Sequence, residues 1–439
     1  MRPTRTFHNG GISIDCGKSW TRPVPAPNAF LPNEAVVPLR QHAGPGARCV
    51  VRKGEFIREG AVIGRADTPM SANVHAPVPG IVKEIRQIPM PDGEMSEAVA
   101  IALEGSFDRL GRKPERYIWT SMLRRDILQC LRDRGIIETT HPGRPLFDLL
   151  AAREPPALLI LNAVESDPYA RSESAIIQDK TEEVLVGFDI LRSILKPGRS
   201  VVAIDGRSPP PPALAAAADP KTFEVAVLES RFPQELPNQL LDALGEKGVD
   251  LAKDGFILSP TCAFAVYEAI VHAKPFVERY VTVAGGAIKR PAVLKARIGT
   301  SIGDLIEECG GFVDAPARVV VGGAVRGMPI HDLDSPVTKT TSSVLALTIG
   351  EIGSRRRRPC IRCGRCADAC PELLDPERLY RLVQGQRWTA ASDEGIAECT
   401  LCGACGYICP SRIPLVAAFA ASPVASDRAK AHRPLETRP

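Results

Sequence analysis

Aromatic residues and excess charge are both scarce in this sequence. Only 5% of the 439 residues are aromatic, and 55 Lys and Arg against 51 Asp and Glu leave a formal net charge of +4. A nucleic-acid-binding surface needs clustered basic residues, and a single-strand binder also needs aromatic side chains for base stacking. No segment interleaves the two types, so we expect no nucleic-acid partner.

Long apolar runs are also missing. A membrane-spanning helix needs about 20 consecutive apolar residues, and the most apolar segments, ALLILNAV at 157–164 and IPLVAAFAA at 413–421, are much shorter. We expect the first to be a buried strand and the second a short core helix. The start, MRPTRTFHNGG, has no apolar segment of the kind that secretory signals carry, so we expect no signal there.

The 13 cysteines do not form a disulfide pattern. Eight of them lie in two short runs near the C-terminal end of the sequence. The other five are scattered without a pairing rhythm: Cys16, Cys49, Cys130, Cys262 and Cys309. This usage is typical of a reducing, cytosolic compartment.

Length and composition predict a multidomain α+β protein, because 439 residues exceed the usual size of one domain. Residues 35–105 alternate short Val- and Ile-rich runs with turn residues, as in VRKGEFIREGAVIG and VHAPVPGIVKEI. They resemble the quasi-symmetric strands of a carrier-like β barrel-sandwich. Because the MSANVHAP segment has no lysine to carry a group, we expect a docking or packing module, which we place at 1–110.

The pattern then changes to alternating helices and strands. ILQCLRDRG, KTEEVLVGFDILRSIL, ALAAAA, LPNQLLDALG and CAFAVYEAIVHA predict helices, whereas ALLILNAV, SVVAIDG and TFEVAVLES predict strands. Strands separated by helices favour a parallel or mixed α/β sheet. We place this unit at 111–275.

Three more segments follow. Residues 276–350 contain two strands around a Gly-Gly turn, a short helix in SIGDLIEECGG with Ser as N-cap and Gly as C-cap, and another strand, which together predict a β-grasp-like unit. The cysteine runs occupy a unit at 351–420. The charged, proline-containing tail at 421–439 is expected to be flexible or bound to a partner.

The two cysteine runs share one spacing. CIRCGRCADACP at 360–371 and CTLCGACGYICP at 399–410 both follow C-x2-C-x2-C-x3-C-P, the spacing of bacterial ferredoxins that bind [4Fe–4S] clusters. A short loop lets three thiolates converge on one cube, while the fourth cysteine reaches the other cube. Structural zinc also takes four cysteines, but usually from two separated C-x2-C pairs. The sequence therefore predicts two [4Fe–4S] clusters.

Each cluster is expected to take three ligands from one run and the fourth from the other. The first set is Cys360, Cys363, Cys366 and Cys409, and the second set is Cys399, Cys402, Cys405 and Cys370. Four arginines at 355–358 precede the first set. They are either a solvated linker or a charge that raises the cluster's potential or attracts an acidic electron-transfer partner.

The order of these segments resembles the RnfC family of the Rnf electron-transport complex over most of the chain. The resemblance is carried by PLRQHAGPGA, VHAPVPGIVKEI, LNAVESDPY, RFPQELPNQLL, CAFAVYEAIVHAKPFVERYVTVAGGAIKRPAVLKARIGT and the two cysteine runs. It implies a carrier-like β barrel-sandwich, an α/β domain similar to the flavoprotein of complex I, a β-grasp (SLBB) domain and a dicluster ferredoxin-like helical domain. It also implies FMN and NADH, and a peripheral position on the cytoplasmic face of the inner membrane beside subunits that move ions.

The sequence departs from this family where a flavin should bind. The family's loop G-x-G-G-A-x-F-P-T is here GIIETTHPGRPLFD, and its Y-P-x-G-G-E-K is here RFPQELPN. A flavin phosphate needs free N–H groups from a loop with almost no side chains. Bulky or β-branched residues stand there instead: Ile136, Ile137, Thr139, Thr140 and His141. We therefore expect no FMN or NADH bound in the family's usual way.

Asn162, Glu165 and Asp167 keep the acidic character of the family's N-G-A-E-C-E-P motif. They follow the buried strand predicted in ALLILNAV. The three side chains either face a nicotinamide or flavin, or they cap the end of that strand.

Three functions fit these features. The first is an electron-transfer subunit that relays electrons through two clusters between a redox partner (ferredoxin, cytochrome or NADH) and ion-translocating membrane subunits. The second is a self-contained FMN-dependent NADH dehydrogenase or cobalamin-reductase-like enzyme. The third is an assembly module whose clusters only stabilise the fold. Because one zinc site would stabilise a fold more simply, the duplicated runs favour electron relay.

Overall fold

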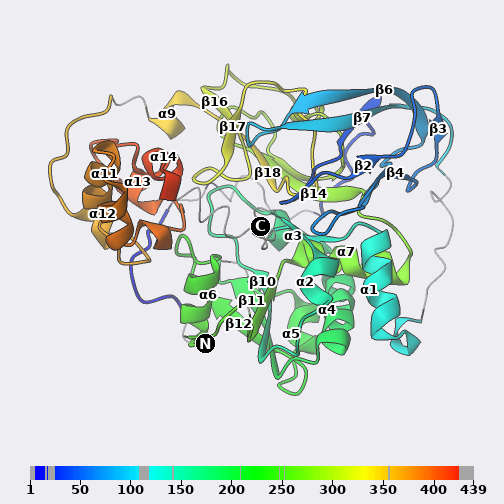
Figure 1. The fold of residues 1–439 in the computed structure, drawn as a ribbon, viewed down its shortest axis with the longest axis horizontal. Helices are drawn as coiled ribbons and strands as arrows, with labels where there is room; N and C mark the ends of the chain where they lie inside the picture. The colour runs from blue at the N-terminus through cyan, green and yellow to red at the C-terminus, as the bar shows by residue number, and fades with distance from the viewer. Residues whose placement is uncertain are drawn as a thin grey trace.

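Four units follow one another along the chain (Figure 1). The structure is a computed structural model, and it describes residues 5–14, 17, 25–107, 118–140, 143–207, 209–246, 248–251, 253–353 and 356–424. Helices and sheets are mixed as expected for a multidomain α+β protein. Three residues named above, Cys16, His141 and Arg355, lie outside the described residues, and so does the expected tail from 425 onward.

The first unit consists of two antiparallel sheets. Its strands are β1 (Glu34–Pro38), β2 (Arg48–Cys49), β3 (Phe56–Ile57), β4 (Val62–Arg65), β5 (Val74–His75), β6 (Gly80–Pro89) and β7 (Met95–Leu103). The sheet orders are β1-β7-β6-β3 and β2-β4-β5. Gly80 is required at the start of β6, because a Cβ there would lie 1.8 Å from the carbonyl oxygen of Ala102. The strands predicted in this region are confirmed.

The second unit contains a parallel sheet of order β12-β11-β10-β13. Its strands are β10 (Leu158–Ala163), β11 (Arg199–Asp205), β12 (Glu224–Leu228) and β13 (Gly255–Leu258), and a small hairpin precedes them as β8 (Ile137–Glu138) and β9 (Arg144–Pro145). The helices are η2 (Trp119–Ser121), α1 (Arg124–Asp133), α2 (Leu146–Leu150), α3 (Ser172–Asp179), α4 (Thr181–Leu195), α5 (Pro212–Ala217), α6 (Pro237–Leu244) and α7 (Pro260–Val271). The predicted α/β sheet and its completely buried strand β10 are confirmed.

The third unit is a five-stranded sheet of order β15-β14-β18-β16-β17 with one helix. Its elements are β14 (Glu278–Ala284), β15 (Ala292–Arg297), α8 (Ile302–Glu308), β16 (Arg318–Val321), β17 (Met328–Ile330) and β18 (Ser343–Leu347). Ser301 caps α8 as predicted, since its hydroxyl accepts the N–H of Asp304 at 2.9 Å.

The fourth unit is a set of short helices. They are α9 (Ile349–Ile352), α10 (Arg365–Asp368), α11 (Pro376–Gln384), α12 (Trp388–Asp393), η3 (Ile396–Glu398), α13 (Ala404–Ile408) and α14 (Leu415–Ala420). Helices α11 to α14 lie at the left of Figure 1, whereas the first helix after β18, α9, lies beside β16 of the third unit. The short core helix predicted in IPLVAAFAA is α14, and its Phe419 side chain is 1% exposed.

Residues 5–14 connect the second and fourth units. Arg5 forms a β-bridge with Leu228 at the end of β12, and Ile12 forms another with Phe232. The N–H of Gly11 donates to the carbonyl of Ala369 at 3.0 Å. This segment therefore lies between the α/β sheet and the helical unit, a position that no sequence pattern predicted.

A buried lysine joins the first three units. Lys339, in the loop before β18, is 1% exposed. Its Nζ donates to the carbonyl of Asn73 in the first unit at 3.0 Å, and to that of Gly135 in the second at 2.7 Å. Burial lowers the pKa of Lys339 to about 7, because the charged ammonium loses its hydration.

Lys339→Met tests this junction through the pH dependence of stability. The pKa of Lys339 is lowered on folding, so the folded chain binds fewer protons than the unfolded chain between about pH 7 and the lysine's ordinary value of 10.5. Stability from this group therefore rises with pH across that window, by about 1.4 kcal/mol per pH unit, and is lost as pH falls toward 7. The Tm of wild type minus that of the variant should increase from pH 7 to 9.5.

Lys83→Met is the matched control, because Lys83 is exposed and pairs with Glu34 on the surface. Its Tm difference from wild type should stay flat with pH. A flat difference for Lys339→Met as well would contradict the lowered pKa.

Candidate metal centre and a filled crevice

The two cysteine runs adopt the same backbone conformation, 39 residues apart in sequence. Each run has a left-handed residue just before its second cysteine, Arg362 and Leu401, both with φ of 54°. Each has a left-handed glycine just after it, Gly364 and Gly403. Helices α10 and α13 then begin at the next residue. These turns wind each run into a tight loop, as the spacing predicts for thiolates around a cluster.

The equivalence continues beyond the loops. Pro371 and Pro410 follow the last cysteines, and Leu373 and Arg412 are both left-handed, with φ of 57° and 52°. Helices α11 and α14 each begin six residues after the last cysteine of their run. Because α10 contacts α13 and α11 contacts α14, the two runs pack as equivalent halves of one unit.

A hollow between the halves brings cysteines of both runs together. It is lined by Cys399, Cys402 and Cys405 of the second run and by Cys370 of the first. Apolar side chains, Leu379 among them, close it. Burial raises the pKa of Cys405, and the nearby charges of Cys402, Cys399 and Cys370 raise it further. The structure thus places the fourth cysteine of one run beside the first three of the other.

The remaining four cysteines lie nearer the surface. Cys360 and Cys363 are exposed, whereas Cys366 and Cys409 are partly buried. Burial raises the pKa of Cys366, and Cys409 is among the charges that raise it further. The Sγ of Cys360 accepts the N–H of Arg362 at 3.3 Å. In the described part of the chain, no three His, Cys, Asp or Glu side chains converge as ligands of a single metal ion.

A second candidate site lies at the carboxyl ends of the parallel strands. In the order β12-β11-β10-β13, strand β13 pairs with β10 on the side opposite β11. Loops that leave two such neighbours diverge, and ligands of α/β sheets bind in the crevice between them. The loop after β10 carries Asn162, Glu165 and Asp167, and α7 begins directly after β13.

Asn162 and Glu165 are bound to neighbouring backbone. The Nδ2 of Asn162 donates to the carbonyl of Glu235 at 3.0 Å. Glu165 accepts the N–H groups of Glu173 and Ser174 at 3.1 and 2.8 Å, so it caps the first turn of α3. Both side chains are buried, with exposed fractions of 7% and 8%.

Asp167 joins the second unit to the third. Its Oδ1 accepts the N–H of Ala324 at 2.7 Å, and its Oδ2 lies 3.8 Å from Nε of Arg326. A side chain at Gly323 would collide with it, because a Cβ there would lie 2.7 Å from Oδ2. Burial raises the pKa of Asp167 to about 6, although Arg326 opposes the shift.

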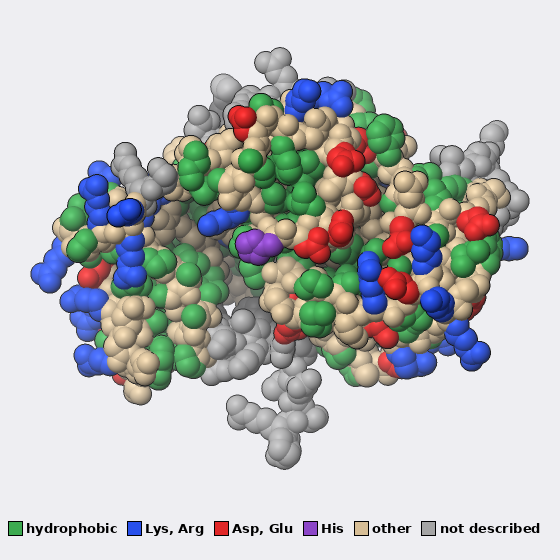
Figure 2. Space-filling view, turned by 90° about the horizontal axis from the view of Figure 1, so that it is seen from above, with side chains coloured by type: hydrophobic (Ala, Val, Ile, Leu, Met, Phe, Trp, Pro, Cys, Tyr) green, Lys and Arg blue, Asp and Glu red, His purple; other side chains and the backbone are tan. Residues whose placement is uncertain are grey.

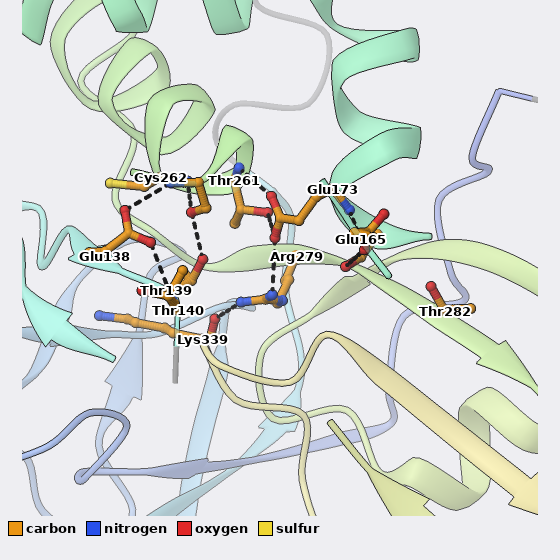
Figure 3. Close-up of polar contacts among 12 residues, drawn as sticks. Glu138, Thr139, Thr140, Glu165, Glu173, Thr261, Cys262, Arg279, Thr282 and Lys339 are labelled. Carbon is orange, nitrogen blue, oxygen red and sulfur yellow. Dashed lines mark hydrogen bonds and ion pairs between the residues drawn. The ribbon is translucent and has the colours of Figure 1, made fainter. Parts of the chain in front are cut away.

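Buried polar side chains of the chain itself lie at the start of α7, directly after β13 (Figure 3). Glu138, which is 4% exposed, accepts the N–H of Ser259 and the N–H of Thr140, both at 3.0 Å. Ser259 is the N-cap of α7 and also hydrogen-bonds Thr139 at 2.9 Å. The N-terminus of a helix attracts anions, and here the anion is the carboxylate of Glu138, whose pKa is raised by burial.

A second carboxylate lies at the same helix end. Glu173 accepts both the N–H and the hydroxyl of Thr261 at 2.8 Å. It also lies 3.5 Å from Nη2 of Arg279, which is 3% exposed and donates to the carbonyl of Lys339. Burial raises the pKa of Glu173 to about 7 against the opposing charge of Arg279. Carboxylates from two different segments thus occupy the first turn of α7.

The residues at this crevice do not fit an FMN. The described backbone of the loop at 135–148 makes its own hydrogen bonds: Ile136 N–H donates to Leu131, and Leu146 N–H to the carbonyl of Ile136 at 3.0 Å. Ile136 and Ile137 are buried at 2% and 0% exposure. The loop therefore presents packed side chains where a flavin phosphate needs free N–H groups.

The acidic-motif residues were predicted from the sequence, but the groups that fill the crevice were not. Glu138 lies inside the GIIETTHPGRPLFD segment, but the prediction of no conventional flavin site was based on its bulky and β-branched neighbours and not on Glu138. Arg279 and Lys339 come from strands and loops more than a hundred residues away in sequence. The one sequence signal for this arrangement was Glu138 itself, a carboxylate in the segment where the RnfC family has a glycine-rich loop.

Four family models match successive parts of the chain. They are the RnfC barrel sandwich hybrid domain at 6–106, the Nuo51 FMN-binding domain at 135–263, the SLBB domain at 280–329 and the 4Fe-4S dicluster domain at 357–413. These matches confirm the predicted fold class. The last match contains all eight cysteines of the two runs, and it confirms two [4Fe–4S] clusters as cofactors. The FMN-binding match covers the segment whose residues fill the crevice.

Similar proteins are named as parts of ion-translocating oxidoreductases. The C subunit of the proton-translocating ferredoxin:NAD(+) oxidoreductase complex of Clostridium ljungdahlii is 29% identical, over 88% of this chain and 86% of that protein. The C subunit of the ion-translocating oxidoreductase complex of Rhodobacter capsulatus is 30% identical, over 95% of this chain and 83% of that protein. A crystal structure of an NAD+-reducing [NiFe]-hydrogenase in its air-oxidised state is similar with a TM-score of 0.47 and 16% identity, over 65% of this chain and 55% of that one.

The identity to the Rhodobacter capsulatus protein extends over most of both chains, and the four family matches follow the order that the resemblance implied. The chain belongs to the RnfC family, whose members are components of the ion-translocating oxidoreductase (Rnf) complexes.

Proposed function

We propose that this chain is the part of an Rnf-type complex that relays electrons between a redox partner and ion-translocating membrane subunits. The observation that carries the proposal is the hollow in which Cys370 joins Cys399, Cys402 and Cys405. When bound, the two [4Fe–4S] clusters each take up and release one electron. A purely structural site would not need two equivalent halves.

We propose the ligand sets that the spacing predicts. Cys399, Cys402, Cys405 and Cys370 form the inner set, and Cys360, Cys363, Cys366 and Cys409 form the outer set. The lining of the hollow supports the inner set, and the outer set takes the four cysteines that remain.

The two sets have different surroundings. Cys402 of the inner set packs in an apolar cluster with Ile12 of the N-terminal segment and Phe232 of the second unit, and Val325 of the third unit lies against it. This packing excludes water on the side of the inner set that faces the rest of the protein. Cys360 and Cys363 of the outer set are open to solvent. The inner set of cysteines therefore faces the rest of the protein, and the outer set faces solvent.

The partners are proposed from the family. None of the described helices is long and apolar enough to cross a bilayer. We propose a peripheral position on the cytoplasmic face of the membrane, where membrane subunits of the complex are one partner and a soluble carrier is the other. The relatives' names mention ferredoxin and NAD(+) for one complex and ion translocation for both.

The filled crevice favours entry of electrons from another protein rather than from NADH. The alternative, a self-contained FMN-dependent NADH dehydrogenase, is favoured by the FMN-binding family match. It requires Glu138 and Glu173 to leave the start of α7, where they accept three hydrogen bonds from Ser259 and Thr261.

Cys370→Ala tests the proposed ligand sets. It should damage the cluster held by Cys399, Cys402 and Cys405 and leave the other cluster largely intact, because Cys370 lies in their hollow. Cys409→Ala is the matched variant and should damage the cluster held by Cys360, Cys363 and Cys366 instead. Electron paramagnetic resonance of the dithionite-reduced proteins, with iron counts, separates the two. If each variant loses the cluster of its own run, the exchange of fourth ligands is wrong.

The absence of a conventional flavin site predicts a specific spectroscopic result. Anaerobically purified protein should release little FMN on acid precipitation, and NADH should leave its visible absorbance unchanged, whereas dithionite should bleach it. Glu138→Gln, which keeps the shape of the side chain, should behave in the same way. Stoichiometric FMN with rapid bleaching by NADH would restore the flavin mechanism.

A further inference from the structure

The first cysteine run lies at the surface and the second is covered. Cys360 and Cys363 are exposed, and Ile361 between them is 67% exposed. The equivalent residues of the second run are less exposed: Cys399 is partly buried, and Cys402 is buried at 8% exposure. The two halves share one backbone, so the difference lies in what surrounds them.

The two runs also differ in charge, and the more exposed first run is the basic one. Residues 356–366 contain five arginines and no acidic residue, whereas the equivalent residues 395–405 contain one acidic residue and no basic one. Every arginine has a small or apolar counterpart: Arg356, Arg357, Arg358, Arg362 and Arg365 correspond to Gly395, Ile396, Ala397, Leu401 and Ala404. Because the second run builds the same loop without cations, the loop itself does not require them.

Four of these arginines are available to a partner. Arg357 donates to the hydroxyl of Tyr380 and lies over its ring at 5.6 Å, so it has an internal role. Arg356, Arg358, Arg362 and Arg365 are exposed, and within the described part of the chain they pair with no Asp or Glu side chain. Basic side chains gather on the lobe at the left of Figure 2, which contains helices α11 to α14. We call Arg356, Arg358, Arg362, Arg365 and Ile361 the arginine face.

The chemistry of this face fits one class of partner. Electron-transfer encounters are brief and small, and complementary charge speeds them by steering the two proteins together. An apolar side chain at the centre of a charged rim excludes water at the point of contact. Here that point is beside Cys360 and Cys363, the exposed ligands of the outer set proposed above.

We propose that the arginine face is the docking surface for a small, acidic, soluble one-electron carrier of the ferredoxin class. The proposal rests on the proposed function and names its partner. Each encounter moves one electron: the donor is oxidised by one electron, the acceptor is reduced by one, and no atom is exchanged. An anionic membrane surface would also attract arginines, but lipid over Cys360 and Cys363 would block access of a carrier to them.

Charge reversal tests the proposal on the full, cluster-loaded chain. Arg362→Glu with Arg365→Glu should lower the association rate of a purified acidic [4Fe–4S] ferredoxin at least tenfold at low salt, and wild-type binding should weaken as salt rises. Arg356→Glu with Arg358→Glu, which lies outside the cysteine loop, should act in the same direction. The matched control is Arg52→Glu with Lys53→Glu, an equal charge change on exposed residues of the first unit, and should stay within about twofold of wild type.

Three further readouts make the result decisive. Iron content and bleaching by dithionite should equal those of wild type in all variants, which separates failure of docking from failure of the proposed function. A basic cytochrome c should bind the wild type poorly and bind the reversed variants better. Equal ferredoxin association by wild type and both arginine variants would overturn the proposal. A second outcome would also overturn the proposal: the wild type binds phosphatidylglycerol vesicles but not ferredoxin, and only the arginine variants lose the vesicle binding. That result would assign the arginine face to the membrane.

Discussion

The rest of the helical unit depends on one constraint, the packing of its two cysteine runs against each other as equivalent halves. Cys370 lies in a hollow with the first three cysteines of the other run and not with those of its own. The two halves must therefore fold together, which explains why α10 contacts α13 and α11 contacts α14. The N-terminal segment and the second and third units then pack against the inner half through Ile12, Phe232 and Val325. An assembled pair of clusters and the packing of the whole protein are thus physically linked.

The crevice of the α/β unit lies where folds of this kind bind ligands, and the chain's own carboxylates lie beside it. Its parallel sheet still diverges between β10 and β13, where such folds bind ligands. The helix that begins there still attracts anions, but Glu138 and Glu173 supply them from within the chain. Arg279 and Lys339 complete a buried network in which burial shifts the pKa of Glu173 and of Lys339 toward 7. These groups hydrogen-bond and pair with one another across the second and third units.

Patterns that are local in sequence were predicted well. The cysteine spacing, the apolar periodicity of α4, the continuous apolar run of β10 and the serine cap of α8 each depend on a few neighbouring residues. The misses depend on long-range geometry. Lys339 bonds to Asn73 across 266 residues, and Ile12 pairs with Phe232. No periodicity marks such contacts, because only the folded arrangement of the units brings the groups together. The arginines of the first cysteine run can be read from the sequence, but the difference in exposure between the two runs can be seen only in the fold.

The central claim, two clusters in two equivalent halves, is tested most directly by metal and sulfide analysis of anaerobically purified protein combined with Mössbauer spectroscopy. Two [4Fe–4S] clusters require about eight iron and about eight sulfide per chain, with one spectrum typical of cubane clusters and no stoichiometric zinc. About four iron per chain, or zinc without acid-labile sulfide, would contradict the account, because at least one half would then not hold a cluster.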